Sequence, residues 1–136
     1  MSFVLGIDTS NYTTSCALLD TADMRVRSCK KLLPVKQGER GLRQSDAVFH
    51  HTKQLPELMK QLFDKKYDIS AVGYSYAPRC AEGSYMPCFL VGENVAQAVS
   101  LACGVDLEKT SHQVGHILAA LYSCGAGLYG ACFIRL

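Results

Sequence analysis

The order of strand-like and helix-like segments restricts the fold of this 136-residue chain more than any other feature. Three short segments, separated by polar turns, predict a meander of adjacent antiparallel strands at residues 3–8, 15–20 and 24–33. Helical and strand periodicities then alternate along the rest of the chain. Helices are expected at 45–64, 88–103 and 112–123, strands at 69–77 and 105–111, and the start of a further strand at 130–136.

A meander followed by alternating helices and strands predicts an α/β fold. The later strands can run parallel only if helices cross over between them, so the sheet is expected to be mixed and flanked by helices. This order is shared by the ribonuclease H-like and actin-like ATPase folds. In actin-like ATPases two such domains face each other across a nucleotide cleft. One domain of this kind would form one half of such a cleft.

Composition and charge limit the class of protein, its partners and its cellular location. Hydrophobic residues make up 49% and charged residues 19%, which is typical of a globular domain, and the net charge of +2 is too small to indicate a nucleic-acid partner by itself. The seven cysteines form no CxxC pair and several lie in apolar runs, so reduced thiols and a cytoplasmic location are expected. The first residues lack a basic segment and no apolar run approaches about 18 residues, so neither a signal peptide nor a membrane span is expected.

The stretch GIDTSNYTT places an acid at the end of the first strand, followed by a turn of hydroxyl and amide side chains. Such a turn can hold phosphate oxygens through backbone N–H groups and hydroxyls, while the acid faces a hydrated Mg²⁺. An ordinary polar turn with a capping acid gives the same pattern. The candidate catalytic acid is Asp8, and the candidate nucleotide-binding residues are Thr9, Ser10, Asn11 and Thr13.

The stretch HQVGH places His112 and His116 four residues apart, on one face of the expected helix. Two such imidazoles are half of a metal site, although two helix histidines with local hydrogen bonds give the same spacing. Zinc peptidases carry Glu directly after the first histidine as general base, and Gln113 cannot take a proton from water. His50 and His51 are possible third ligands, but adjacent helix residues diverge by about 100°, so at most one of them faces a given site.

Four segments carry a resemblance to a known family. LGIDTSNYTTSCALLD, GLRQSDAVFHHTKQLPEL, AVGYSYAPR with VGENVAQAVS, and HQVGHILAAL occur in the order and spacing typical of the N-terminal half of the TsaD family, also called glycoprotease or O-sialoglycoprotein endopeptidase. The resemblance extends over nearly the whole chain. The two histidines followed by an apolar helix are its most specific part.

The resemblance implies an activity and its cofactors. Members of the TsaD family have two actin-like ATPase domains, and residues 1–136 resemble the N-terminal one, with the second domain outside this sequence. They transfer a threonylcarbamoyl group from an adenylate to a tRNA adenosine beside the anticodon. The implied nucleotide is ATP or the threonylcarbamoyl-adenylate, with Mg²⁺. An iron or zinc ion serves the reaction. By motif, His112 and His116 resemble two of its ligands, and a further acidic ligand belongs to the second domain. The implied partners are tRNA and the other subunits of the tRNA-modification machinery.

Departures from the family pattern indicate a divergent paralogue and keep two alternatives open. Asn11 and Tyr12 replace the Cys-Asp of the first motif, and residues 77–79, Ala-Pro-Arg, replace a Gly-Pro-Gly turn. A non-catalytic actin-like scaffold that pairs with a catalytic subunit is the first alternative, and a metallopeptidase, disfavoured by Gln113, is the second. The apolar helical stretches 55–63 and 89–102 also predict a homodimer of this fragment.

Overall fold

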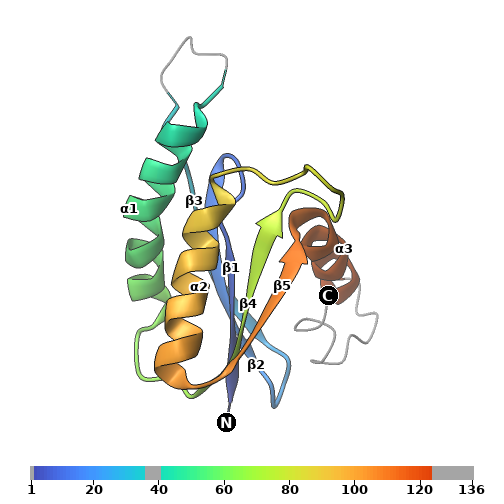
Figure 1. The fold of residues 1–136 in the computed structure, drawn as a ribbon. Helices are drawn as coiled ribbons and strands as arrows, with labels where there is room; N and C mark the ends of the chain where they lie inside the picture. Colours follow the sequence, from blue (N-terminus) through green and yellow to red (C-terminus); the bar gives the residue numbers. More distant parts are fainter. Residues whose placement is uncertain (1, 36–40, 124–136) are drawn as a thin grey trace.

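The computed structural model describes residues 2–35 and 41–123. They form a five-stranded sheet in the order β3-β2-β1-β4-β5 (Figure 1). Its strands are β1 (Phe3–Asp8), β2 (Thr13–Asp20), β3 (Val26–Leu32), β4 (Ile69–Ala77) and β5 (Asp106–Ser111). The first three pair antiparallel, whereas β4 runs parallel to β1 and β5 parallel to β4. The predicted mixed sheet is therefore confirmed, while the strand expected at 130–136 lies outside the described residues.

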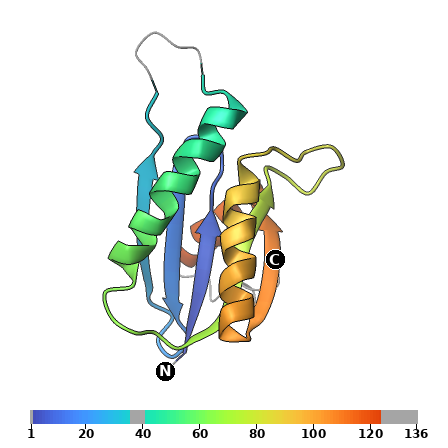
Figure 2. The same ribbon diagram turned by 60° about the vertical axis from the view of Figure 1, so that its left-hand side comes forward.

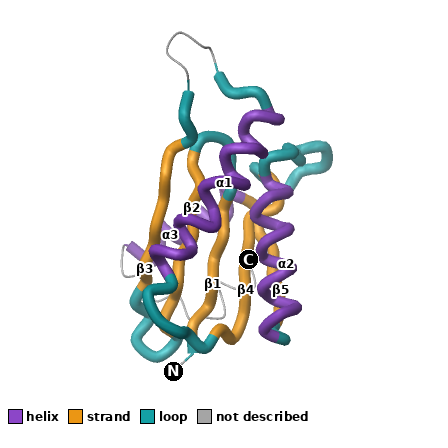
Figure 3. The backbone as a smooth tube through the Cα atoms, turned by 90° about the vertical axis from the view of Figure 1, so that its left-hand side faces the viewer, coloured by secondary structure: helices purple, strands orange, loops and turns teal. Residues whose placement is uncertain are grey.

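Three helices flank the sheet as the sequence predicts. They are α1 (Gln44–Leu62), α2 (Phe89–Cys103) and α3 (His112–Ser123). Helices α1 and α2 cover one face of the sheet and α3 lies against the other (Figures 2 and 3). Within residues 2–35 and 41–123, no helix has both the length and the apolar character needed to cross a membrane.

The strand boundaries differ from expectation where the backbone turns. The second strand begins at Thr13, two residues early, because the polar Thr13 and Thr14 already pair with β3. The third strand begins at Val26, because Met24 takes a left-handed conformation with φ of 61° and belongs to the preceding turn. The backbone N–H of Asp20 donates to the carbonyl of Arg25 and closes that hairpin.

The hydrophobic core lies between the sheet and the α1–α2 layer. Alternate residues of β1 and β2 point into it, and α1 contributes one face at helical spacing. Its fully buried members include Leu5, Leu18, Leu55, Leu62 and Val72. Each such side chain contributes about 1.5–3 kcal/mol by leaving water. The core therefore fixes one face of the sheet and leaves the residues between these positions to point toward α3.

Gly92 allows α2 to pack closely against the end of β1. A Cβ atom at Gly92 would lie 3.0 Å from Thr9 Oγ1 and 3.1 Å from Ile7 Cγ2. Thr9 cannot move aside easily, because its hydroxyl donates to the carbonyl of Cys88 and accepts from the Gly92 N–H. This contact sets the position of the segment that follows β1.

We predict that Gly92→Ala destabilises the protein although alanine favours helices. Overpacking typically costs about 1–3 kcal/mol, whereas the helix gains roughly 1 kcal/mol. Gly115→Ala is the matched control, since this helical glycine has open space around its Cβ position. Urea unfolding should show a lower midpoint for Gly92→Ala and an unchanged or higher one for Gly115→Ala. Equal gains in both variants would contradict the packing argument.

Candidate functional site

Asp8 stands where the carboxyl ends of two parallel strands meet. Because β1 and β4 are parallel neighbours, Asp8 lies beside Ser75, whose hydroxyl donates to Asp8 Oδ2 at 2.7 Å. The backbone N–H of Ser10 donates to the other carboxylate oxygen at 2.9 Å. Strand β5 ends at the same edge and α3 begins with the next residue, so His112 Nδ1 also reaches Asp8 Oδ2, at 2.8 Å.

These contacts decide the charge on Asp8. Burial by itself would raise the pKa of its carboxyl group, but the hydrogen bonds from His112, Ser75 and Ser10 outweigh it and lower the pKa to about 2. Asp8 is therefore an ionised acceptor at neutral pH, and His112 Nδ1 must donate to it. The same hydrogen bond raises the pKa of His112 against the opposing effect of burial.

The second histidine meets the free side of the first imidazole. The Nε2 atoms of His112 and His116 are 2.8 Å apart, and the two rings meet edge to face. Two nitrogens bound to one tetrahedral zinc ion are about 3.3 Å apart, so a small rotation of either ring would admit a metal. A histidine that donates its other N–H to a carboxylate is the usual arrangement around protein-bound metals. The donor set of His112 and His116 thus fits a metal ion.

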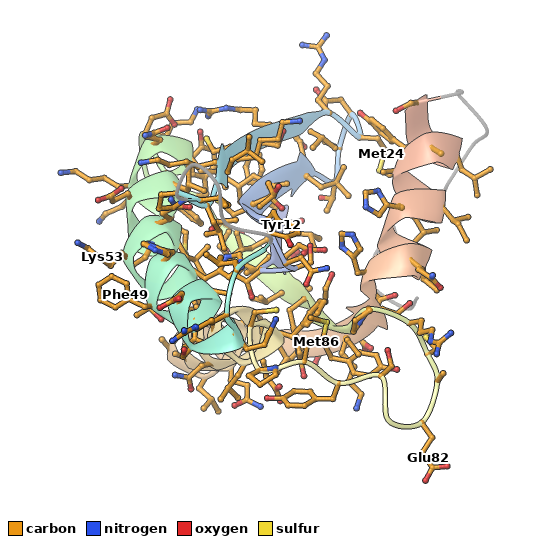
Figure 4. The ribbon with its side chains drawn as sticks, turned by 90° about the horizontal axis from the view of Figure 1, so that it is seen from above. Tyr12, Met24, Phe49, Lys53, Glu82 and Met86 are labelled. Atoms are coloured by element: carbon orange, nitrogen blue, oxygen red, sulfur yellow. The ribbon has the colours of Figure 1, made fainter. Side chains whose placement is uncertain are left out.

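The neighbouring histidines do not complete this pair. His51 is fully buried on the α1 side of the sheet, away from α3. His50 packs edge to face on Phe49, which Figure 4 shows on the outer side of α1 together with Lys53. Among residues 2–35 and 41–123, no three metal-ligating side chains come together. Both histidines of α1 are therefore excluded as the third ligand.

The turn after Asp8 presents fewer ligand-binding groups than its sequence suggests. Thr9 is fully buried and Ser10 almost so, and the Thr9 hydroxyl is already bonded to Cys88 and Gly92. Asn11 is exposed at a φ of 30°, and Thr13 is half-buried. The structure thus leaves Asn11 and Thr13 as the candidate residues whose side chains reach the solvent side of the turn.

A buried polar cluster that was not foreseen supports this turn from the α1 side. His51 Nδ1 lies 2.7 Å from Thr14 Oγ1, which donates to Gln54 Oε1 at 3.0 Å. Gln54 Nε2 donates in turn to the carbonyl of Leu32 at 3.3 Å. The cluster joins α1 to β2 and β3 directly behind the turn. Its signal in the sequence is the polar pair His51 and Gln54 on the otherwise apolar face of α1.

A groove of about 690 Å³ extends from the histidine pair between α3 and the sheet. Its lining includes strand residues that alternate with the core positions, among them Gly6, Ser15, Ala17 and Gly73. Figure 4, a view down the strands, shows α3 on one side of the sheet, α1 on the other, and Tyr12 near the strand ends between them. Asp8, His112 and His116 lie at the polar end of this groove.

The sheet order and the placement of its helices are those of the actin-like ATPase fold. The structure of YeaZ from Pseudomonas aeruginosa superimposes with a TM-score of 0.62 at 20% identity, covering 92% of this chain and 51% of that one. At this identity the match shows the fold alone. It confirms the fold class predicted from the sequence.

The sequence comparison adds a relationship. The chain is 28% identical over 127 residues to the tRNA N6-adenosine threonylcarbamoyltransferase of Pyrobaculum calidifontis and 30% identical over 125 residues to that of Campylobacter curvus. Each match covers 90% of this chain and 35% of the relative. A probable bifunctional tRNA threonylcarbamoyladenosine biosynthesis protein of Thermoplasma acidophilum is 27% identical over 118 residues, 84% of this chain and 21% of that one. No family model matches the chain.

The chain is thus a distant relative of the threonylcarbamoyltransferases. It spans about a third of the length of the two threonylcarbamoyltransferases and about a fifth of the Thermoplasma acidophilum protein. The resemblance predicted from the four sequence segments is confirmed as a distant relationship.

We predict that His51 makes the protein less stable in mild acid. Burial lowers the pKa of His51, so below about pH 6.5 the unfolded chain binds a proton that the folded ring resists. The free energy of unfolding should then fall as pH decreases, by at most about 1.4 kcal/mol per pH unit. The raised pKa of His112 changes the free energy of unfolding in the opposite direction as pH falls. The contribution of His51 is therefore isolated by comparing the parent protein with a His51 variant.

In His51→Gln, urea unfolding between pH 7 and pH 5 should show a smaller loss of stability with acid than in the parent protein. Gln54→Met is the control, because it disturbs the same cluster but keeps the titrating ring. The prediction is wrong if His51→Gln and the parent lose stability equally over this range.

Proposed function

We propose that residues 1–136 form the N-terminal part of a TsaD-like, metal- and nucleotide-dependent transferase that moves a threonylcarbamoyl group from an adenylate to a tRNA adenosine. The observation that carries the proposal is the alignment of His112 by Asp8, which turns His112 Nε2 toward His116 Nε2. The relatives that share this activity in their names are about three times as long. We therefore infer that this part is not active alone.

The proposed metal is one iron or zinc ion held by His112 and His116. When bound, it would polarise the carbonyl group of the adenylate as a Lewis acid. Asp8 then acts as a positioning residue, because both of its carboxylate oxygens accept hydrogen bonds from the protein and one of them fixes the His112 tautomer. A further ligand, an acid by family resemblance, would come from outside the described residues.

The nucleotide, ATP or the adenylate with Mg²⁺, is proposed to meet the turn after β1. Asn11, Thr13 and the backbone of the turn supply its contacts, since the hydroxyl of Thr9 is engaged elsewhere. One domain offers only one wall of such a site, so binding to residues 1–136 is expected to be weak. The implied partners are tRNA and subunits of the tRNA-modification machinery, in the cytoplasm, where the free thiols of the five described cysteines would persist.

A scaffold role is the second candidate, and the surface of α2 favours it. Leu90 is 51% exposed and Leu101 is 83% exposed, which leaves apolar area for a partner subunit or for a second copy of this chain. Tyr12, which stands in the place of the family's acid, is 47% exposed and offers no carboxylate. A scaffold would not need the histidine pair, so metal binding separates the two candidates. A peptidase role stays disfavoured by Gln113.

We predict that the chain binds zinc modestly through both histidines. Competition with a chromophoric chelator should show that the double variant His112→Ala, His116→Ala loses this affinity. Asp8→Asn should weaken it by about tenfold or more, because it removes the charge that orients His112. His50→Ala on the outer face of α1 is the control and should bind as the parent does. Undiminished zinc affinity in the double variant would contradict the metal-site proposal and favour the scaffold role.

A further inference from the structure

His51 carries a buried ring nitrogen to which no protein group donates a hydrogen bond. Its side chain is fully buried, and among residues 2–35 and 41–123 no donor reaches the Nε2 atom. The other ring nitrogen, Nδ1, lies 2.7 Å from the hydroxyl oxygen of Thr14. A buried polar atom without a partner lowers stability and is uncommon in native proteins. The position of Nε2 therefore indicates a group that binds or titrates there.

The neighbouring hydrogen bonds decide which nitrogen of His51 carries the proton. The carbonyl of Leu32 can only accept, so Gln54 turns its Nε2 atom toward it and leaves Oε1 as an acceptor. The Thr14 hydroxyl donates its single hydrogen to that oxygen. The same hydroxyl can therefore only accept from His51 Nδ1. In the neutral ring, Nδ1 is thus protonated and Nε2 is a bare acceptor.

The peptide between Asn11 and Tyr12 connects this nitrogen with the turn after β1. The Asn11 carbonyl lies close enough to the His51 ring to raise its pKa. Since Nδ1 is engaged with Thr14, Nε2 is the nitrogen left to face that carbonyl. In a trans peptide the carbonyl and the following N–H point in opposite directions, so the Tyr12 N–H points away from His51. Within the part of the chain that the structure describes, no group accepts a hydrogen bond from this N–H.

The groups around His51 determine its charge. Burial lowers its pKa, the Asn11 carbonyl and the Asp8 carboxylate act in the opposite direction, and His50 on the same helix lowers the pKa further. The net effect is a lowered pKa, so the ring is neutral at pH 7. A further negative charge near the turn would favour the protonated ring, as Asp8 already does.

The other elements beside this region add no net charge. At the start of α2, burial raises the pKa of the Cys88 thiol, which therefore stays uncharged. On β3, Lys31 lies opposite Thr14 and its Nζ atom is 3.9 Å from a carboxylate oxygen of Glu57. Both charges of that ion pair are exposed and offset each other, so the charge of His51 responds mainly to groups bound at the turn.

We propose that His51 is a positioning residue that takes up a proton when an anion binds at the turn after β1. A protonated Nε2 would donate to the Asn11 carbonyl, hold the peptide between Asn11 and Tyr12, and polarise its outward N–H, because hydrogen bonds in a chain strengthen one another. That N–H contacts an anionic group of the nucleotide, and the positive ring offsets part of the repulsion from Asp8. The inference rests on the proposed nucleotide contact of this turn and adds proton uptake to it.

The test uses the 136-residue chain with sulfate as the probe, because sulfate does not titrate between pH 5 and pH 8. NMR signals of the histidine rings are followed over this range in sodium sulfate and in sodium chloride at equal ionic strength. Saturating sulfate should raise the pKa of His51 by about half a pH unit or more, and it should shift the amide signal of Tyr12. By linkage, half a pH unit corresponds to about threefold tighter sulfate binding by the protonated protein. His50, which packs on Phe49, is the internal control and should titrate alike in both salts.

A variant separates the role of His51 from that of the turn. In His51→Gln, which keeps a polar side chain but cannot titrate, the affinity for sulfate should depend less on pH than in the parent protein. His50→Gln is the matched control and should behave as the parent does.

Two results would overturn the inference: equal pKa values of His51 in sulfate and chloride, or a parent-like pH dependence of sulfate binding in His51→Gln. The first is measured on the parent chain and does not depend on the folding of a variant. If the Tyr12 amide still shifts in either case, the turn binds an anion without His51 and the proposed nucleotide contact stands. Zinc binding by His112 and His116 is measured independently, so failure of the transferase proposal is recognised by itself.

Discussion

The hydrogen bond between Asp8 and His112 joins the two parts of the molecule on which the candidate site depends. Asp8 is the last residue of β1, the central strand of the sheet. His112 is the first residue of α3, which lies on the sheet face opposite to α1 and α2. Other contacts also hold α3: the Gln113 N–H donates to the carbonyl of Pro78, the Tyr122 hydroxyl donates to that of Met24, and Leu118 is buried. A hydrogen bond to a charged group contributes about 1.5–3 kcal/mol. The Asp8–His112 bond therefore positions the histidine pair and one wall of the groove together.

Successive side chains along each strand point to opposite faces of the sheet, so one face packs in the core and the other lines the groove. Ile7 points into the core under α2, and its neighbour Asp8 points toward α3. On β2, Cys16 and Leu18 are buried while Ser15 and Ala17 line the groove. The core can thus stabilise the fold from one face, which leaves the other face free to carry small and polar residues that would be costly in a core.

The fold could be predicted from the sequence because its signals are local. Strand alternation, polar turns and helical spacing in α1 each lie within about twenty residues, and the HQVGH spacing places both histidines on one helix face. The bond between Asp8 and His112 could not be predicted, since it joins residues 104 positions apart through two crossovers. The burial of Thr9 was also hidden, because only the close approach of α2 at Gly92 turns its hydroxyl inward. The pairing of β1 with β4 also depends on a register that no single segment specifies.

The Asp8–His112 hydrogen bond orients a side chain as well as holding a helix in place. The Asp8–His112 hydrogen bond holds α3 in position, but apolar residues of similar size could also hold α3 against the sheet, because burying a charged group costs hydration. The pair instead fixes one imidazole tautomer and directs its second nitrogen at His116. This is the alignment that the proposed metal ligand would need.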